Sequence, residues 1–139
     1  MYKYIEPEVA GELGNETILD NTTHPPLVKK LHFLFQGWLG DDFIECFPIY
    51  IVTERLFNEI ETSKLTGVIF DEVKVTTSDE FKSMYPHVQL PTFIWMKVIG
   101  ETNNADFSIA TDLRLLISEK ALDVLRKFKI ADAIISDFK

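Results

Sequence analysis

Apolar and polar residues along the chain follow two different periods, and these periods separate predicted strands from predicted helices. Strands are indicated by alternation, or by β-branched and aromatic residues, over 2–5, 30–36, 48–52, 68–75, 92–99, 113–117 and 133–138. The segment 43–46 fits either a further strand or the first turn of a helix. Residues 1–26 are expected to form an N-terminal strand followed by an irregular arm, because Gly, Asn, Thr and Pro recur there without a period.

Three short helices are predicted, each opened by a hydroxyl residue that can cap it. Thr53, Ser78 and Ser118 stand directly before apolar residues at helical spacing. A hydroxyl oxygen at that position accepts a backbone N–H of the first helical turn. Glu54 and Glu119 come next in two of the three cases, where the helix dipole favours a negative charge. These features predict the residues at which the helices begin.

The segment VTERLFNEIETSKLTGVIFDEV, residues 52–73, has a counterpart 65 positions later in ISEKALDVLRKFKIADAIISDF, residues 117–138. Both segments read as strand, hydroxyl cap, Glu, cation, amphipathic helix, turn and strand. Two strands joined through one helix usually lie parallel, with a right-handed crossover. The sequence therefore predicts two similar β-α-β units, at about 48–75 and 113–138. They are expected to lie in one α+β domain, residues 1–139, with a mixed β-sheet, and we interpret the repeat as a building block.

The charge balance narrows the class of partner. Net charge is −8, from 14 Lys and Arg against 22 Asp and Glu. An acidic surface repels nucleic acid phosphates, so no nucleic acid partner is expected, whereas a basic protein would be attracted. The single Cys46 permits no internal disulfide and fits a reducing cytoplasm. No apolar run approaches the ~20 residues of a membrane-spanning helix, so we expect a cytoplasmic protein with no membrane segment.

The repeated carboxylates Glu54 and Glu119 are the first candidates for catalysis, since two carboxylates can divide the acid and base roles. Each lies one residue after a capping hydroxyl, however, and helix capping explains that position without a substrate. The three His residues have no ligand spacing, and the Gly residues form no phosphate-binding loop. We therefore expect no metal, no cofactor and no catalytic residue. A small hydrolase that uses Glu54, Glu119 or Asp106 is the alternative.

Three segments resemble families of small bacterial immunity proteins, which are encoded beside polymorphic or contact-dependent toxins. LLISEKALDVLRKF, residues 115–128, is similar to their recurrent V-S-E-K-A-L-x-x-L segment. QGWLGDDFIECFPIYIVTERL, residues 36–56, resembles the stretch before the corresponding helix, and ADF, residues 105–107, resembles the lead-in to the last unit. The resemblance covers residues 31–138 and implies a cytoplasmic protein that binds and neutralises a cognate toxin domain.

The resemblance and the charge together suggest a basic toxin domain as the partner, bound stoichiometrically. An aromatic anchor ringed by charges is a frequent hot-spot arrangement at protein interfaces. The candidate partner-binding residues are one aromatic residue and three pairs of acids: Trp38, Asp41, Asp42, Asp71, Glu72, Asp79 and Glu80. Trp38 fits a core position as well as an interface. A structural or homo-oligomeric module, whose exposed faces pair between copies, is the remaining alternative.

Overall fold

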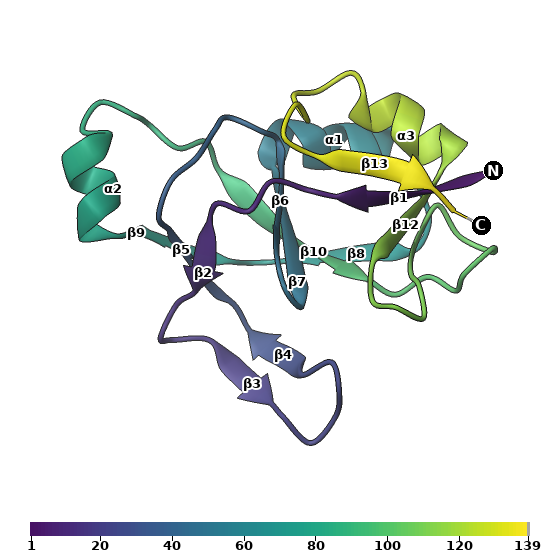
Figure 1. The fold of residues 1–139 in the computed structure, drawn as a ribbon, viewed down its shortest axis with the longest axis horizontal. Helices are drawn as coiled ribbons and strands as arrows, with labels where there is room; N and C mark the ends of the chain where they lie inside the picture. Colours follow the sequence, from purple (N-terminus) through teal and green to yellow (C-terminus); the bar gives the residue numbers. More distant parts are fainter. Residues whose placement is uncertain (139) are drawn as a thin grey trace.

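A computed structural model describes residues 1–138 and has a mixed α+β fold, which confirms the predicted fold class (Figure 1). The first four-stranded sheet has the order β11 (Phe107–Ile109), β12 (Leu115–Ser118), β1 (Tyr2–Glu6) and β13 (Ile134–Asp137). The second has the order β6 (Phe43–Cys46), β7 (Ile49–Thr53), β10 (Phe93–Val98) and β8 (Val68–Asp71). The helices are α1 (Glu54–Thr62), α2 (Asp79–Met84) and α3 (Glu119–Leu125).

Two smaller sheets complete the fold. One contains β2 (Gly11–Leu13), β5 (His32–Phe35) and β9 (Lys74–Thr77), and the other is the hairpin of β3 (Ile18–Asp20) and β4 (Leu27–Lys30). Figure 1 shows this hairpin projecting from one side of the body and α2 standing at one end, whereas α1 and α3 lie side by side.

The two predicted β-α-β units are present, and each contains an additional strand at its centre. In the first unit β7 and β8 are parallel, but β10 lies between them and pairs antiparallel with both. In the second unit β1 occupies the corresponding position between β12 and β13. The crossover therefore spans one intervening strand in each unit.

The two units agree in the pairing of individual residues. Trp95 of β10 lies opposite Ile51 and Asp71, and Tyr4 of β1 lies opposite Leu116 and Ser136. Leu116 and Ser136 are the residues that stand 65 positions after Ile51 and Asp71. The internal repeat of the sequence is thus a repeat of the structure with the same strand register.

In neither unit does the central strand come from the chain segment that joins the two parallel strands. The strand β1 precedes the first unit in the chain but completes the sheet of the second, and β10 follows the first unit and completes its sheet. Because β1 and β10 occupy equivalent positions, the two halves of the chain have exchanged their central strands.

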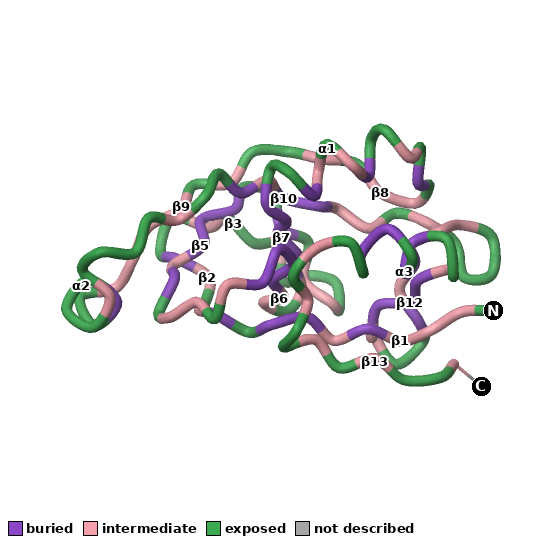
Figure 2. Tube along the Cα trace, turned by 90° about the horizontal axis from the view of Figure 1, so that it is seen from above, coloured by how far each residue is buried: buried purple, intermediate pink, exposed green. Residues whose placement is uncertain are grey.

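The core lies on both faces of the second sheet. On β7, Tyr50 and Val52 pack into a cluster with α1, α3 and the first sheet, whereas Ile49 and Ile51 pack into a cluster with the three-stranded sheet. A strand that is buried on both faces reads as a continuous apolar run, as 48–52 does. Figure 2 shows the buried residues concentrated along the middle of the molecule and the exposed ones on its periphery. Trp95 is buried, as the sequence suggested.

Three predicted boundaries differ from the structure. The expected irregular arm contains β2 and β3, because β2 pairs with β5 and β3 forms a hairpin with β4. The predicted strand 68–75 is two strands, β8 and β9, which belong to different sheets. The ambiguous segment 43–46 is a strand. Pairing with another strand decided each case, and local propensity carries little information about such pairing.

Candidate functional site

The loop 36–42, which leads into β6, carries the aromatic residue and the first acid pair predicted from the sequence. Asp42 is 1% exposed. Its carboxylate accepts hydrogen bonds from Thr53 Oγ1 (2.6 Å), from Arg55 Nε (2.7 Å) and Nη2 (2.6 Å), and from the backbone N–H of Lys129 (2.8 Å). Burial by itself raises the pKa of Asp42, but these hydrogen bonds outweigh burial and hold the pKa below its usual range. Asp42 is therefore a buried, charged and well-bonded carboxylate.

Asp106 is the equivalent residue of the second unit, at the start of β11. Its carboxylate accepts hydrogen bonds from Ser118 Oγ (2.6 Å) and from the backbone N–H of Thr66 (2.8 Å). Its pKa is lowered, since these hydrogen bonds outweigh the effect of burial. Each aspartate thus contacts the N-cap hydroxyl of its own unit and the loop after the helix of the other unit. The repeated polar residues link the two units reciprocally.

Asp41 lies beside Asp42 and is also buried, with no exposed surface. Its carbonyl oxygen accepts a hydrogen bond from Trp38 Nε1 (2.9 Å), and its carboxylate accepts one from the backbone N–H of Asp132 (2.8 Å). The expectation that Asp41 and Asp42 face a partner is therefore corrected. The physical reason is that backbone N–H groups from distant segments draw both carboxylates inward, which adjacent acids in a sequence do not reveal.

Trp38 is half-buried and lies between two shallow depressions of the surface. Its ring packs edge-to-face on Phe93, with centroids 6.0 Å apart and planes at 82°. One depression, of about 420 Å³, also includes Arg55 and Leu90 in its lining. The other, of about 300 Å³, also includes Leu39 and Tyr85. Trp38 therefore packs against the core and also lines both depressions of the surface.

A third depression, of about 310 Å³, joins the first two. It shares Leu90 with one and Tyr85 with the other, and Phe81 of α2 and the later residue Val88 line it as well. Two exposed apolar side chains line these depressions: Leu39 and Val88 are 62% and 41% exposed. We call the area formed by Trp38, Leu39, Tyr85, Val88 and Leu90 the Trp38 surface. Exposed apolar area of this kind marks interaction sites in proteins.

The other predicted acids are exposed. Asp79 and Glu80 form the first turn of α2, and Tyr85, the C-cap residue of this helix, belongs to the Trp38 surface. Asp71 and Glu72 lie at the end of β8, where Asp71 accepts a hydrogen bond from Lys97 Nζ (2.8 Å). The structure therefore divides the predicted acids into a buried pair, a pair on α2 and a pair beside β8.

Glu54 and Glu119 occupy the first positions of α1 and α3, and both are exposed. The capping residues behave as predicted, since Thr53 and Ser118 accept hydrogen bonds from the backbone N–H groups of Leu56 and Ala121. The hydrolase alternative required two acids that converge in a concave pocket. The exposed positions of Glu54 and Glu119 do not support that arrangement.

Glu8 and Asp132 are the polar residues near this site that sequence reasoning missed. Glu8 is 3% exposed, and its carboxylate accepts hydrogen bonds from the backbone N–H groups of Leu39 (2.7 Å) and Asp41 (3.1 Å). Ligand oxygens of Glu8, Asp41 and Asp132 lie within 4.8 Å of one another, so this group could hold a metal ion. Because the three residues come from three distant segments, no spacing in the sequence indicates that they meet.

Comparisons with known proteins give no relative for this chain. A scan against models of protein families, a search of curated proteins and a search of solved structures each found no match. Within residues 1–138, no helix has the length and apolar character needed to cross a membrane.

Proposed function

We propose that this protein is an immunity protein that binds a cognate bacterial toxin domain stoichiometrically and neutralises it. The observation that carries the proposal is the Trp38 surface, an exposed apolar and aromatic area beside the acidic first turn of α2. The polar residues repeated in both units, Asp42, Asp106, Thr53 and Ser118, form internal contacts. The fold accounts for their repetition, which leaves the Trp38 surface as the candidate interface. The resemblance to immunity proteins over residues 31–138 supplies the class of partner.

The proposed partner surface is basic with an apolar centre. Apolar side chains such as Leu39 and Val88 would bury against the toxin, and desolvated contacts of this kind contribute most of the binding energy at interfaces. Asp79 and Glu80 would lie at the rim and attract a basic domain, which raises the association rate more than the affinity. The net charge of −8 acts in the same direction.

Co-expression tests the proposal directly. The toxin-like domain encoded beside this gene would be expressed in a sensitive strain, with and without this protein, and the purified pair would be analysed by light scattering. We expect growth to be restored and a complex of defined stoichiometry to form. Growth arrest that persists despite abundant folded protein would refute the proposal.

Surface variants test the assignment of the interface. Leu39→Asp and Val88→Asp place a charge in the apolar centre and are expected to speed dissociation at least ~10-fold, since an unpaired charge at an interface is costly to bury. The matched control is Ile134→Asp, at a residue that is 63% exposed on β13. Asp79→Asn combined with Glu80→Gln should slow association at low salt and leave dissociation nearly unchanged. Normal binding by all of these variants would place the interface elsewhere.

A further inference from the structure

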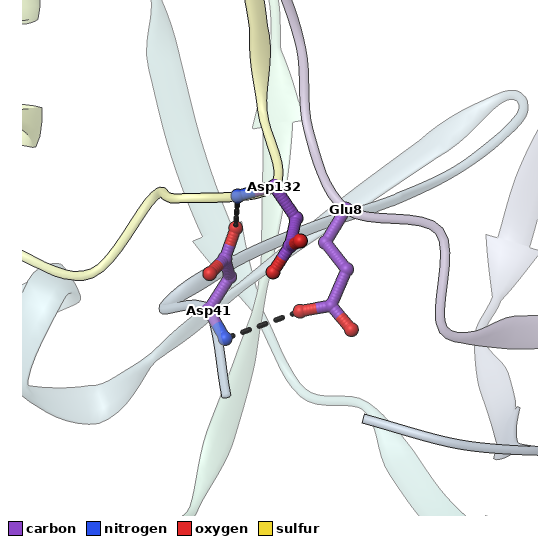
Figure 3. A group of neighbouring side chains, drawn as sticks. All are labelled: Glu8, Asp41 and Asp132. Carbon is purple, nitrogen blue, oxygen red and sulfur yellow. Dashed lines mark hydrogen bonds between the residues drawn. The ribbon is translucent and has the colours of Figure 1, made fainter. Parts of the chain in front are cut away.

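Three carboxyl groups from distant parts of the chain meet beside the loop 36–42. Figure 3 shows the Asp132 side chain lying between those of Asp41 and Glu8. Glu8 follows β1, Asp41 precedes β6, and Asp132 lies in the loop between α3 and β13. Glu8 and Asp41 are buried, whereas Asp132 is exposed, so the group opens to solvent through Asp132.

The protein compensates the negative charge of this group only in part: the nearby charge of Lys129 favours the ionised form of Asp41, but Lys129 forms no ion pair with the group. Among residues 1–138, no Lys, Arg or His forms an ion pair with Glu8, Asp41 or Asp132. Burial raises the pKa of both Glu8 and Asp41, and the neighbouring acids raise the pKa values further. Asp42, the next residue in the chain, shows the contrast, because Arg55 forms an ion pair with it.

One carboxylate oxygen of the group is buried and accepts no hydrogen bond from residues 1–138. Asp41 Oδ1 is fully buried and has no hydrogen-bond partner, although Asp41 Oδ2 accepts the N–H of Asp132. A buried carboxylate oxygen without a donor is costly, and such an atom in a native protein needs an explanation. A bound cation would satisfy the oxygen and balance the charge at the same time.

We propose that Glu8, Asp41 and Asp132 bind a hard divalent cation, with Ca²⁺ as the best fit. All the ligands are oxygens, which favours Ca²⁺, Mg²⁺ or Mn²⁺ over zinc and copper. Two oxygens bound to one Ca²⁺ ion lie at most ~5 Å apart, because each bond is about 2.4 Å long, and the three oxygens lie within 4.8 Å. Irregular loops also suit the flexible coordination of Ca²⁺ better than the strict octahedron of Mg²⁺. Water from the open side would complete the coordination.

The ion would join three segments that belong to different elements, namely the chain after β1, the loop before β6 and the loop before β13. This inference does not depend on the proposed function, since it concerns only these three side chains. It differs from the sequence-based expectation of no metal, which rested on the spacing of the His residues and the single Cys.

Terbium luminescence tests the proposal, because Tb³⁺ replaces Ca²⁺ and can be excited through a nearby indole. Trp38 Nε1 lies 2.9 Å from the carbonyl oxygen of Asp41, which places a suitable indole beside the site. We expect saturable emission that Ca²⁺ displaces, with a Ca²⁺ Kd on the order of 10⁻⁵ to 10⁻³ M. Calorimetric titration with Ca²⁺ provides an independent measurement.

Two variants and one control locate the ion. Asp41→Asn and Asp132→Asn should each weaken Ca²⁺ binding roughly 10-fold or more, since each removes a charged ligand. Asp132 is exposed, so its variant will keep the fold even if Asp41→Asn does not. Asp123→Asn, at an exposed position on α3, should bind Ca²⁺ normally. Folded protein that shows no saturable binding at millimolar Ca²⁺ would overturn the proposal, as would binding that survives both site variants.

Discussion

Two carboxylates, Asp42 and Asp106, link the two units of this protein. Asp42 is buried and Asp106 is half-buried, and each accepts several hydrogen bonds from charged, hydroxyl or backbone donors. Hydrogen bonds to an ionised group are about twice as strong as neutral ones, and this compensates for the loss of hydration. Removing the acceptor leaves donors buried without a partner, which costs more than the hydrogen bonds contribute.

Replacing Asp42 is expected to lower the free energy of unfolding more than replacing its partner Arg55. Asp42→Ala should lower the free energy of unfolding by about 3 kcal/mol or more, because the Thr53 hydroxyl and the Lys129 N–H lose their acceptor. Arg55→Gln should cost less, about 1–2 kcal/mol: it removes the counter-ion of a buried carboxylate, but Thr53 and the Lys129 N–H still donate to Asp42 and the Arg55 side chain is 66% exposed. Urea denaturation of both variants measures the difference. Equal costs would contradict the structural role assigned to Asp42.

The helix caps are expected to differ in strength for a related reason. Thr53→Ala and Ser118→Ala should each cost about 1–2 kcal/mol, with Thr53 the larger, because Thr53 is buried and Ser118 is half-buried. Each change removes both the cap and one donor to an aspartate. Thr62→Ala, at the exposed end of α1, is the control and should be nearly neutral. The same denaturation assay applies, and an unchanged Thr53→Ala midpoint would be inconsistent with this assignment.

The contribution of Asp106 should depend on pH with a definite sign. Its folded-state pKa lies below the usual value of 3.8, since hydrogen bonds from Ser118 and Thr66, and the nearby charge of Lys120, favour the ionised form. The stabilisation is therefore complete above the unfolded pKa and is lost as pH falls through the folded pKa. Asp106→Asn should destabilise at pH 7 and cost progressively less below about pH 4. Urea denaturation of the unchanged protein and of Asp106→Asn between about pH 7 and pH 3 measures this dependence. A difference in the free energy of unfolding that stays constant over this range would argue against an ionised Asp106.

At the scale of elements, the predictions that depended on local chemistry succeeded. All three helices begin after the predicted hydroxyl caps, because a cap is formed by residues two or three positions apart. The β-α-β repeat was also visible, since its pattern lies in a continuous segment. The positions of the central strands β1 and β10 in the sheets could not be predicted, because pairing between strands that are far apart in the chain leaves no periodic signal in either partner.

The candidate site was less predictable than the fold. Trp38 was named as a candidate because it lies in a turn with Gly37 and Gly40. Tyr85 and Val88 lie in the same area only because of the tertiary structure. Asp41 and Asp42 were predicted to face solvent, but an acid can be buried where hydrogen-bond donors surround it, and the sequence does not show which donors lie nearby. The sequence thus indicated the type of residue at the site but not its environment.

The loop between β10 and β11 should be sensitive to one added methyl group. A Cβ atom at Gly100 would lie 2.1 Å from Phe107 O and 2.6 Å from Ala105 Cβ, so the backbone around β11 must move. Gly100→Ala is therefore expected to lower the free energy of unfolding by about 3 kcal/mol or more. Gly37→Ala is the matched control, since nothing lies within 4 Å of its Cβ position. A thermal melt distinguishes the two, and similar midpoints would contradict the close packing at Gly100.

At the scale of the whole molecule, the exchange of β1 and β10 makes each half of the chain depend on the other. The contacts of Asp42 with Lys129 and of Asp106 with Thr66 add to this dependence. We therefore expect one cooperative unfolding transition in place of separate transitions for the two units.

A core change in one unit should consequently be detected in the other. Ile5→Ala in β1 should cost about 2–4 kcal/mol, since Ile5 is 1% exposed in the core. In a Trp38→Phe background, the fluorescence of Trp95 in the other sheet should follow the same lowered midpoint as circular dichroism. If the Trp95 signal kept its original midpoint, the two units would be independent.

The exchanged strand also affects how the chain can fold while it is being synthesised. Residues 2–6 leave the ribosome well before their partners β12 and β13, which begin more than a hundred residues later. While the residues between them are synthesised, this strand exposes unpaired backbone N–H and C=O groups, and such a strand can pair with a neighbouring nascent chain on the same polysome. The interval before the second unit leaves the ribosome is therefore a period in which this strand is exposed to aggregation.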